Sequence, residues 1–256
     1  MIYIPPSGRT YNGSYVPSLT CDGVITLICN VTCETLILDG VISSNYNARV
    51  GALDATGKVC FRGGIGARNA VWHGYSDLQG NMTISSLLQI SGNFRSRSEI
   101  IAGSVDLEGN IRIDGRLTAS QITGCAQLGL GITNAKVFVV DFREQSRIAK
   151  LTGSNIIIHR APFSLMTRLF LNRVASQSTF LDIPGGITGD YIDIEHVRAE
   201  TVTGADVNIG PGCIINTVRY RDHIYIDENA WVGKYEAFDD PDDSESSGSD
   251  SNSDDH

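Results

Sequence analysis

The side chains most often used in catalysis are few in this chain and lie far apart in the sequence. The five histidines stand singly, and the six cysteines include no Cys-x-x-Cys pair. They are His73, His159, His196, His223, His256, Cys21, Cys29, Cys33, Cys60, Cys125 and Cys213. In a reducing compartment, such cysteines behave as small buried hydrophobic residues. We therefore predict no catalytic residues, no metal and no cofactor, and we expect that the protein is not an enzyme.

Two segments nevertheless have the composition of a ligand-binding or catalytic motif. Gly63–Gly66 looks like a phosphate-binding turn, but it lacks the lysine and hydroxyl residue that follow such a turn. Asn208–Ile215 resembles one coil of the hexapeptide-repeat acyltransferases, and that resemblance implies a histidine acting as general base. The six-residue repeat is not sustained on either side of this segment. A β-helical enzyme of this type, or a passive binding module, remains the alternative function.

The charge of the chain is concentrated at its C-terminus. The formal net charge is −9, but residues 239–256 hold eight carboxylates and no lysine or arginine, which leaves 20 basic and 21 acidic residues elsewhere. A nearly neutral body gives no electrostatic footprint for nucleic acid. No apolar run reaches the roughly 18 residues of a membrane span, and Met1–Thr10 lacks the apolar core of a signal peptide. These features predict a cytoplasmic protein with a disordered acidic tail.

Glycines recur along the chain with a nearly constant spacing. They are Gly23, Gly40, Gly57, Gly74, Gly92, Gly109 and Gly124, with gaps of 17, 17, 17, 18, 17 and 15 residues. The residue before each of them is polar. A polar residue followed by glycine is typical of a turn, because glycine adopts a positive φ without a steric penalty.

Apolar residues recur at fixed distances after these glycines. Two positions after them stand Ile25, Ile42, Val59, Ser76, Phe94, Ile111 and Ala126. Eight positions after them stand Val31, Ala48, Ile65, Met82, Ile100, Leu117 and Ile132. Thirteen positions after them stand Leu36, Leu53, Ala70, Leu87, Val105, Ile122 and Val137. All but Ser76 are apolar, which predicts three columns of buried side chains.

The spacing of the columns predicts the fold class. Steps of six, five and about six residues describe a coil of about 17 residues with three short strands and one main inward residue per strand. Stacking such coils about 4.8 Å apart pairs each strand with its equivalents above and below. We therefore predict an all-β protein, a parallel β-helix solenoid. Leu53 and Leu87 are expected to be fully enclosed in it.

The repeat is interrupted once, which divides the chain into five parts. We predict an N-terminal segment at 1–20, coils at 21–160, an excursion at 161–188, further coils at 189–235 and the acidic tail at 236–256. Within the excursion, residues 164–174 have the pattern of a short amphipathic helix that begins at Ser164.

The repeat and its turns are similar to those of the bactofilins, a family of bacterial polymer-forming cytoskeletal proteins. In Ser91–Leu117 an x-Gly-x-apolar pattern alternates with acidic-Gly turns. Val202–Cys213, followed by Val218–Tyr220 and Asp227–Ala230, resembles the C-terminal part of an extended subgroup found in Gram-positive bacteria. The resemblance covers roughly residues 20–235.

The resemblance implies a right-handed β-helix that assembles end to end, without nucleotide, into non-polar filaments. Members of the family act as scaffolds for cell shape, motility or envelope enzymes, and some contact the membrane. The partners expected here are the chain itself, unknown client proteins and the inner face of the cell membrane. Two segments are candidates for that membrane contact, Met1–Ile4 and residues 164–174.

The ends of the solenoid are the expected contact surfaces, because each end exposes unpaired strand edges over an apolar core. The candidate contacts at the two ends are Val24, Ile25, Ile224, Ile226, Trp231 and Val232.

Overall fold

The structure is a computed structural model that describes residues 2–4, 16–162 and 179–238. All regular structure in these residues is β-strand, and all strand pairs are parallel. The strands are β1 (Ile2–Ile4), β2 (Val16–Leu27), β3 (Val31–Ser44), β4 (Ala48–Phe61), β5 (Ile65–Leu78), β6 (Met82–Ser96), β7 (Ile100–Ile113), β8 (Leu117–Phe142), β9 (Ser146–Arg160), β10 (Leu181–Ile183), β11 (Ile187–Thr188), β12 (Tyr191–Ile194), β13 (Val197–Ile209), β14 (Ile214–Ile226) and β15 (Trp231–Ala237).

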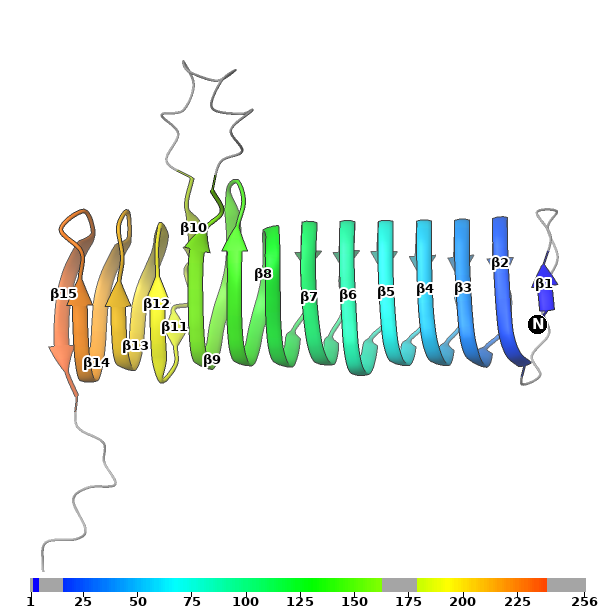
Figure 1. Ribbon diagram of the computed structural model, residues 1–256, viewed down its shortest axis with the longest axis horizontal. Coiled ribbons are helices and arrows are strands. Elements are labelled where there is room, and N and C mark those ends of the chain that lie inside the picture. The colour runs from blue at the N-terminus through cyan, green and yellow to red at the C-terminus, as the bar shows by residue number, and fades with distance from the viewer. Residues whose placement is uncertain (1, 5–15, 163–178, 239–256) are drawn as a thin grey trace, which may run out of the picture.

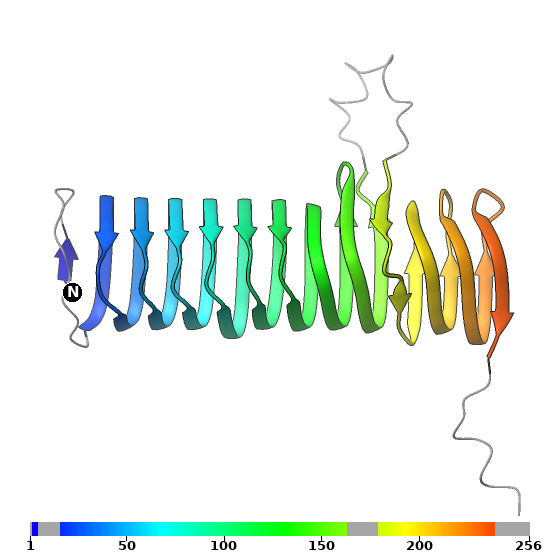
Figure 2. The ribbon, with the colours of Figure 1, turned by 180° about the vertical axis from the view of Figure 1, so that it is seen from behind.

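These strands form one solenoid of about 12 turns. Each of β3 to β7 is nearly one whole coil, and each coil pairs with the next in chain order. Figure 1 shows the coils in a single row from β1 to β15, and the view from behind shows the same order (Figure 2). The predicted parallel β-helix with coils of about 17 residues is therefore confirmed.

The core follows from a regular alternation within each coil. In β3 the buried side chains are Val31, Cys33, Leu36, Leu38, Ile42 and Ser44, and the residues between them face outward or turn corners. Each coil thus has three sides with two inward residues each, where we predicted one main inward residue per side. The strand is also continuous through the corners, and not three separate short strands.

The predicted glycine turns are present at most of the predicted positions. Gly23, Gly40, Gly57, Gly74, Gly92 and Gly109 pair with one another coil by coil, with φ angles between 94° and 109°. A β-carbon on Gly74 would lie 2.6 Å from the carbonyl oxygen of Gly57. The stacked turns therefore require glycine for its conformation and for the close approach of the backbones.

The prediction for Leu87 is wrong. The gap between Gly74 and Gly92 has one extra residue, and the register of β6 shifts between Ile84 and Leu87. The extra residue bulges outward, so Leu87 is 40% exposed and Leu88 pairs with Ala70 in the core. Leu53 is buried as predicted.

The inward residues predicted by counting from the last glycine, Gly124, are also misplaced. Gly124 pairs with Leu107, and Ala126 takes the place opposite Gly109. Counting from Gly124 therefore starts two residues early, and Leu128 rather than Ala126 continues the column of Ile111. Ile132 is 44% exposed and Val137 is half-buried, while their neighbours Thr133 and Phe138 are fully buried.

The solenoid extends beyond the predicted boundaries. β2 begins inside the predicted N-terminal segment, and β15 ends at Ala237. Strand pairing resumes at Leu181, inside the predicted excursion, because β10 lies between β9 and β13. The predicted helix at 164–174 and residues 239–256 lie outside the described residues.

Candidate functional site: the ends of the solenoid

The C-terminal end of the solenoid has an incomplete last coil. β15 pairs with the first half of β14, from Ile214↔Trp231 to Tyr220↔Ala237. The second half of β14, Arg221–Ile226, pairs with β13 on one side, and no described strand lies on its other side. The outer edge of β15 likewise has no strand partner in the described part of the chain. Both edges present backbone donors and acceptors in the direction of the solenoid axis.

Three of the predicted contact residues terminate columns of the core at this end. Ile224 continues the column of Val207, and Ile226 that of Ile209. Val232 lies on Ile215. The three terminal side chains are only partly buried, whereas the residues beneath them are buried. This end is therefore an apolar surface rimmed by open strand edges.

Trp231 belongs to a different surface. It pairs with Ile214 on the outward side of its strand, and its side chain is 54% exposed. Tyr235, which the sequence analysis did not select, continues the core column of Val218 and is 60% exposed. Val232 and Tyr235 are three residues apart, so simple alternation along a strand from Val232 does not reach Tyr235.

The charges on the last strand are paired with one another. Lys234 Nζ lies 2.6 Å from Glu236 Oε2, and Arg219 Nε lies 3.3 Å from Glu236 Oε1. The hydrogen bond and charge of Lys234, together with Arg219, lower the pKa of Glu236. These exposed pairs leave the apolar column ends as the main feature of this surface.

The N-terminal end differs from the C-terminal end. β1 pairs with Leu19–Cys21 of β2, so the chain returns to its own first coil there. Of the two predicted contacts, Ile25 is only 2% exposed and is not an accessible contact. Val24 is 68% exposed, but it pairs with Val41 in a row that faces sideways.

Of the two candidate membrane contacts, the structure describes only the N-terminal one. Ile2–Ile4 forms β1, so its backbone is used in strand pairing with β2. Residues 164–174 lie outside the described residues. Among the described residues, no helix has the length and hydropathy that crossing a membrane would need.

The acyltransferase-like segment forms part of a stacked corner. Cys213 Sγ donates to the carbonyl oxygen of Ile194 at 3.3 Å. Burial raises the pKa of the Cys213 thiol to about 12, so it is protonated at neutral pH and is a poor nucleophile. Burial, with a smaller effect of Arg160, lowers the pKa of His196. This corner combines a protonated thiol with a partly buried histidine that favours the neutral form.

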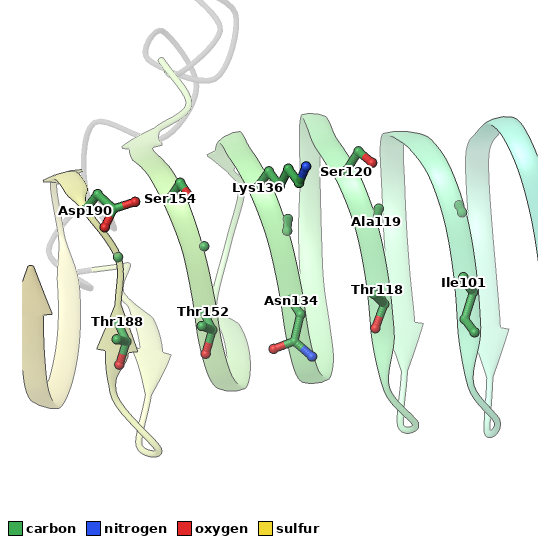
Figure 3. Close-up of a pocket in the computed structure, with 14 residues that line it drawn as sticks. Ile101, Thr118, Ala119, Ser120, Asn134, Lys136, Thr152, Ser154, Thr188 and Asp190 are labelled. Atoms are coloured by element: carbon green, nitrogen blue, oxygen red, sulfur yellow. The ribbon is translucent and has the colours of Figure 1, made fainter.

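A shallow groove of about 730 Å³ runs along one side of the solenoid, across β7 to β11. Figure 3 shows a row of short side chains along it, Ile101, Thr118, Asn134, Thr152 and Thr188, one from each successive coil. Alanines and glycines form the floor. Lys136 and Asp190 are the charged residues of the lining, which contains no histidine or cysteine. The groove offers hydrogen bonds but no acid–base pair.

The remaining cysteines and the acidic residues of the described ranges do not gather into a metal site. Within the described residues, no group of three histidine, cysteine, aspartate or glutamate side chains is arranged to hold an ion. Burial raises the pKa of Cys21 to about 11 and also raises that of Cys33.

Comparison with known proteins gives no relative. No protein-family model, no curated protein and no solved structure matches this chain. The geometry of the solenoid is therefore the basis for inferring its function.

Proposed function

We propose that the chain is a self-assembling scaffold that polymerises end to end into nucleotide-independent, non-polar filaments, as the resemblance to the bactofilins implies. The observation that carries this proposal is the open C-terminal end. Its core columns stop at partly buried apolar side chains, and its strand edges have no described partner. A second copy would extend the hydrogen-bond ladder and bury the ends of the core columns.

Contact between like ends follows from the difference between the two ends. An isologous contact uses the same surface on both subunits and closes around a two-fold axis. The C-terminal end supplies such a surface through Ile224, Ile226 and Val232. Because an isologous contact joins only two subunits, a filament also needs the N-terminal ends to meet. There β1 pairs with Leu19–Cys21 alone, and the rest of the outer edge of β2 has no strand partner among the described residues. We place this polymer in the cytoplasm, at the inner face of the membrane, with client proteins bound along its sides.

Electron microscopy of the purified full chain tests the proposal. The wild-type protein should form filaments in physiological salt without ATP or GTP. Ile226→Arg should yield small soluble particles, because a charge at the end of a core column must be desolvated when a second copy binds. Circular dichroism should show that the β-rich spectrum is retained.

A matched control separates end contact from general surface change. Ile101→Arg introduces the same charge at an exposed isoleucine on the side of the solenoid and should leave the filaments intact. If Ile226→Arg proves unfolded, Val232→Arg at the neighbouring column end provides a second variant. Wild-type protein that remains monomeric, or an Ile226→Arg protein that polymerises like wild type, would overturn the proposal. The binding-module interpretation would then take its place.

A further inference from the structure

The nearly neutral charge of the coils conceals a separation of charge between two sides of the solenoid. The strand register gathers outward residues of successive coils into rows parallel to the axis. We call one set of rows the acidic face: Asp22, Asp39, Asp54, Asp106, Glu108, Asp141, Asp193 and Glu195. They lie on the side of the coil that carries Leu36 and Leu38 in β3, and among the described strands no lysine or arginine occupies these rows.

The next side of the coil, which carries Ile42 and Ser44 in β3, has the opposite charge. We call it the basic face: Arg62, Arg95, Arg97, Arg112, Arg147 and Arg198. Arg95 pairs with Arg112 on the adjacent coil, so like charges lie next to each other. Asp77, Asp114 and Asp182 are interspersed among these arginines, but the six arginines outnumber them and the basic face has a net positive charge.

The three aspartates neutralise only part of the charge of the six arginines on the basic face. Asp114 contacts both Arg112, at 2.8 Å, and Arg95, at 3.7 Å. Asp77 contacts Arg97 at 3.7 Å, and Asp182 contacts Arg198 at 3.5 Å. The side chains in all four pairs are at least partly exposed, so such pairs stabilise the fold by at most about 1 kcal/mol each.

The two faces also match in spacing. Both are built on the same coils, so charges in each row recur at multiples of about 4.8 Å. When the acidic face of one solenoid lies along the basic face of another, the rows can align over many coils. Each exposed pair contributes little alone, but a row of them gives a cumulative and directional attraction.

We propose that a second copy of this chain binds side by side, with its acidic face against the basic face of the first. This contact is heterologous, so a pair still presents one free acidic face and one free basic face to further copies. Lateral association of this kind goes beyond end-to-end assembly and depends only on the solenoid fold. It would join single filaments into bundles or sheets.

Salt provides the first part of the test. The Debye length is about 10 Å at 0.1 M salt and about 3 Å at 1 M, so raising the salt should separate the lateral contacts. Electron microscopy and light scattering should show bundles at low salt and single filaments at high salt. Apolar end contacts should persist. If end contacts fail, single solenoids should still pair side by side, so failure of the proposed function and failure of this proposal are distinguishable.

Charge reversal provides the second part. Asp54→Lys/Asp106→Lys reverses the charge at two positions of the acidic face and halves its net charge from −8 to −4. Arg112→Glu/Arg147→Glu reverses the charge at two positions of the basic face, so each double variant should weaken lateral association. An equal mixture of the two should restore it, because the two introduced lysines of one variant complement the two introduced glutamates of the other. Arg49→Glu/Arg68→Glu changes the net charge by the same amount away from both faces and should bundle like wild type.

Three results would overturn the proposal. The first is a wild-type protein without lateral contacts at low salt, and the second is bundling that survives both double reversals. The third is a basic face that binds vesicles of phosphatidylserine and phosphatidylcholine, loses this in Arg112→Glu/Arg147→Glu and shows no lateral contacts. That outcome would assign the basic face to an anionic membrane surface.

Discussion

At the scale of single residues, Leu87 and Leu88 show how sharply the coil separates inside from outside. Leu88 is fully buried between Ala70 and Val105, whereas Leu87 is 40% exposed at the bulge. We expect Leu88→Ala to lower the free energy of unfolding by about 2–5 kcal/mol, through lost burial and the cavity left behind. Leu87→Ala should cost less than about 0.5 kcal/mol. Urea denaturation followed by circular dichroism measures both, and equal effects would show that the register is wrong.

The cysteines provide a second prediction at this scale. Burial raises the pKa of the Cys213 thiol to about 12, so it stays protonated at pH 8. Cys21 and Cys33 are likewise buried with raised pKa values. Iodoacetamide at pH 8 should therefore label half-buried Cys60 and Cys125 in the folded protein and spare these three until denaturant is added. Mass spectrometry of the labelled peptides checks this. Rapid labelling of Cys213 in native protein would contradict its buried position.

At the scale of the coil, the stacked glycine turns limit which substitutions the fold tolerates. Gly74 has a φ of 105°, and its β-carbon would lie 2.6 Å from the backbone oxygen of Gly57. Gly74→Ala should therefore destabilise the protein by about 1–3 kcal/mol. Gly66→Ala is the matched control, because its nearest neighbour would be 3.9 Å away and its φ is not positive. Thermal denaturation of the two variants compares them, and an equal loss of stability in both would argue against stacked turns.

The same turns explain which parts of the fold could be predicted from the sequence. Polar-Gly pairs at a 17-residue period fix where each coil begins, and they predicted the parallel solenoid and most of its core. Counting from a glycine fails where the coil changes length, as at the Leu87 bulge and at Gly124. There, backbone pairing with the neighbouring coil determines which side chain turns inward, and a count along one chain contains no such information.

The candidate site was predicted less completely, for a related reason. Apolar content alone selected Trp231 and Ile25 together with Ile224 and Ile226. Only the strand register shows that Trp231 faces sideways and that the latter two end core columns. The charged faces were missed because the net charge of the coils is near zero. They emerge only when Asp54, Asp106 and their neighbours are placed in rows.

At the scale of the whole molecule, the solenoid predicts the axial repeat of its polymer. About 12 coils at a spacing of about 4.8 Å give a length of about 60 Å per molecule. If like ends meet, two molecules related by a two-fold axis form the repeating unit, so the repeat is about 120 Å. Head-to-tail stacking would instead give about 60 Å.

Cryo-electron microscopy of the filaments distinguishes these arrangements. The averaged power spectrum should contain a meridional reflection near 4.8 Å from the stacked coils and a repeat near 120 Å from paired molecules. The reflection from the coils is expected for either polarity and serves as the internal control. A repeat near 60 Å with the coil reflection intact would retain the end-to-end scaffold but reject contact between like ends. The apolar C-terminal end would then have to fit against the first coil, where β1 pairs with part of the edge of β2.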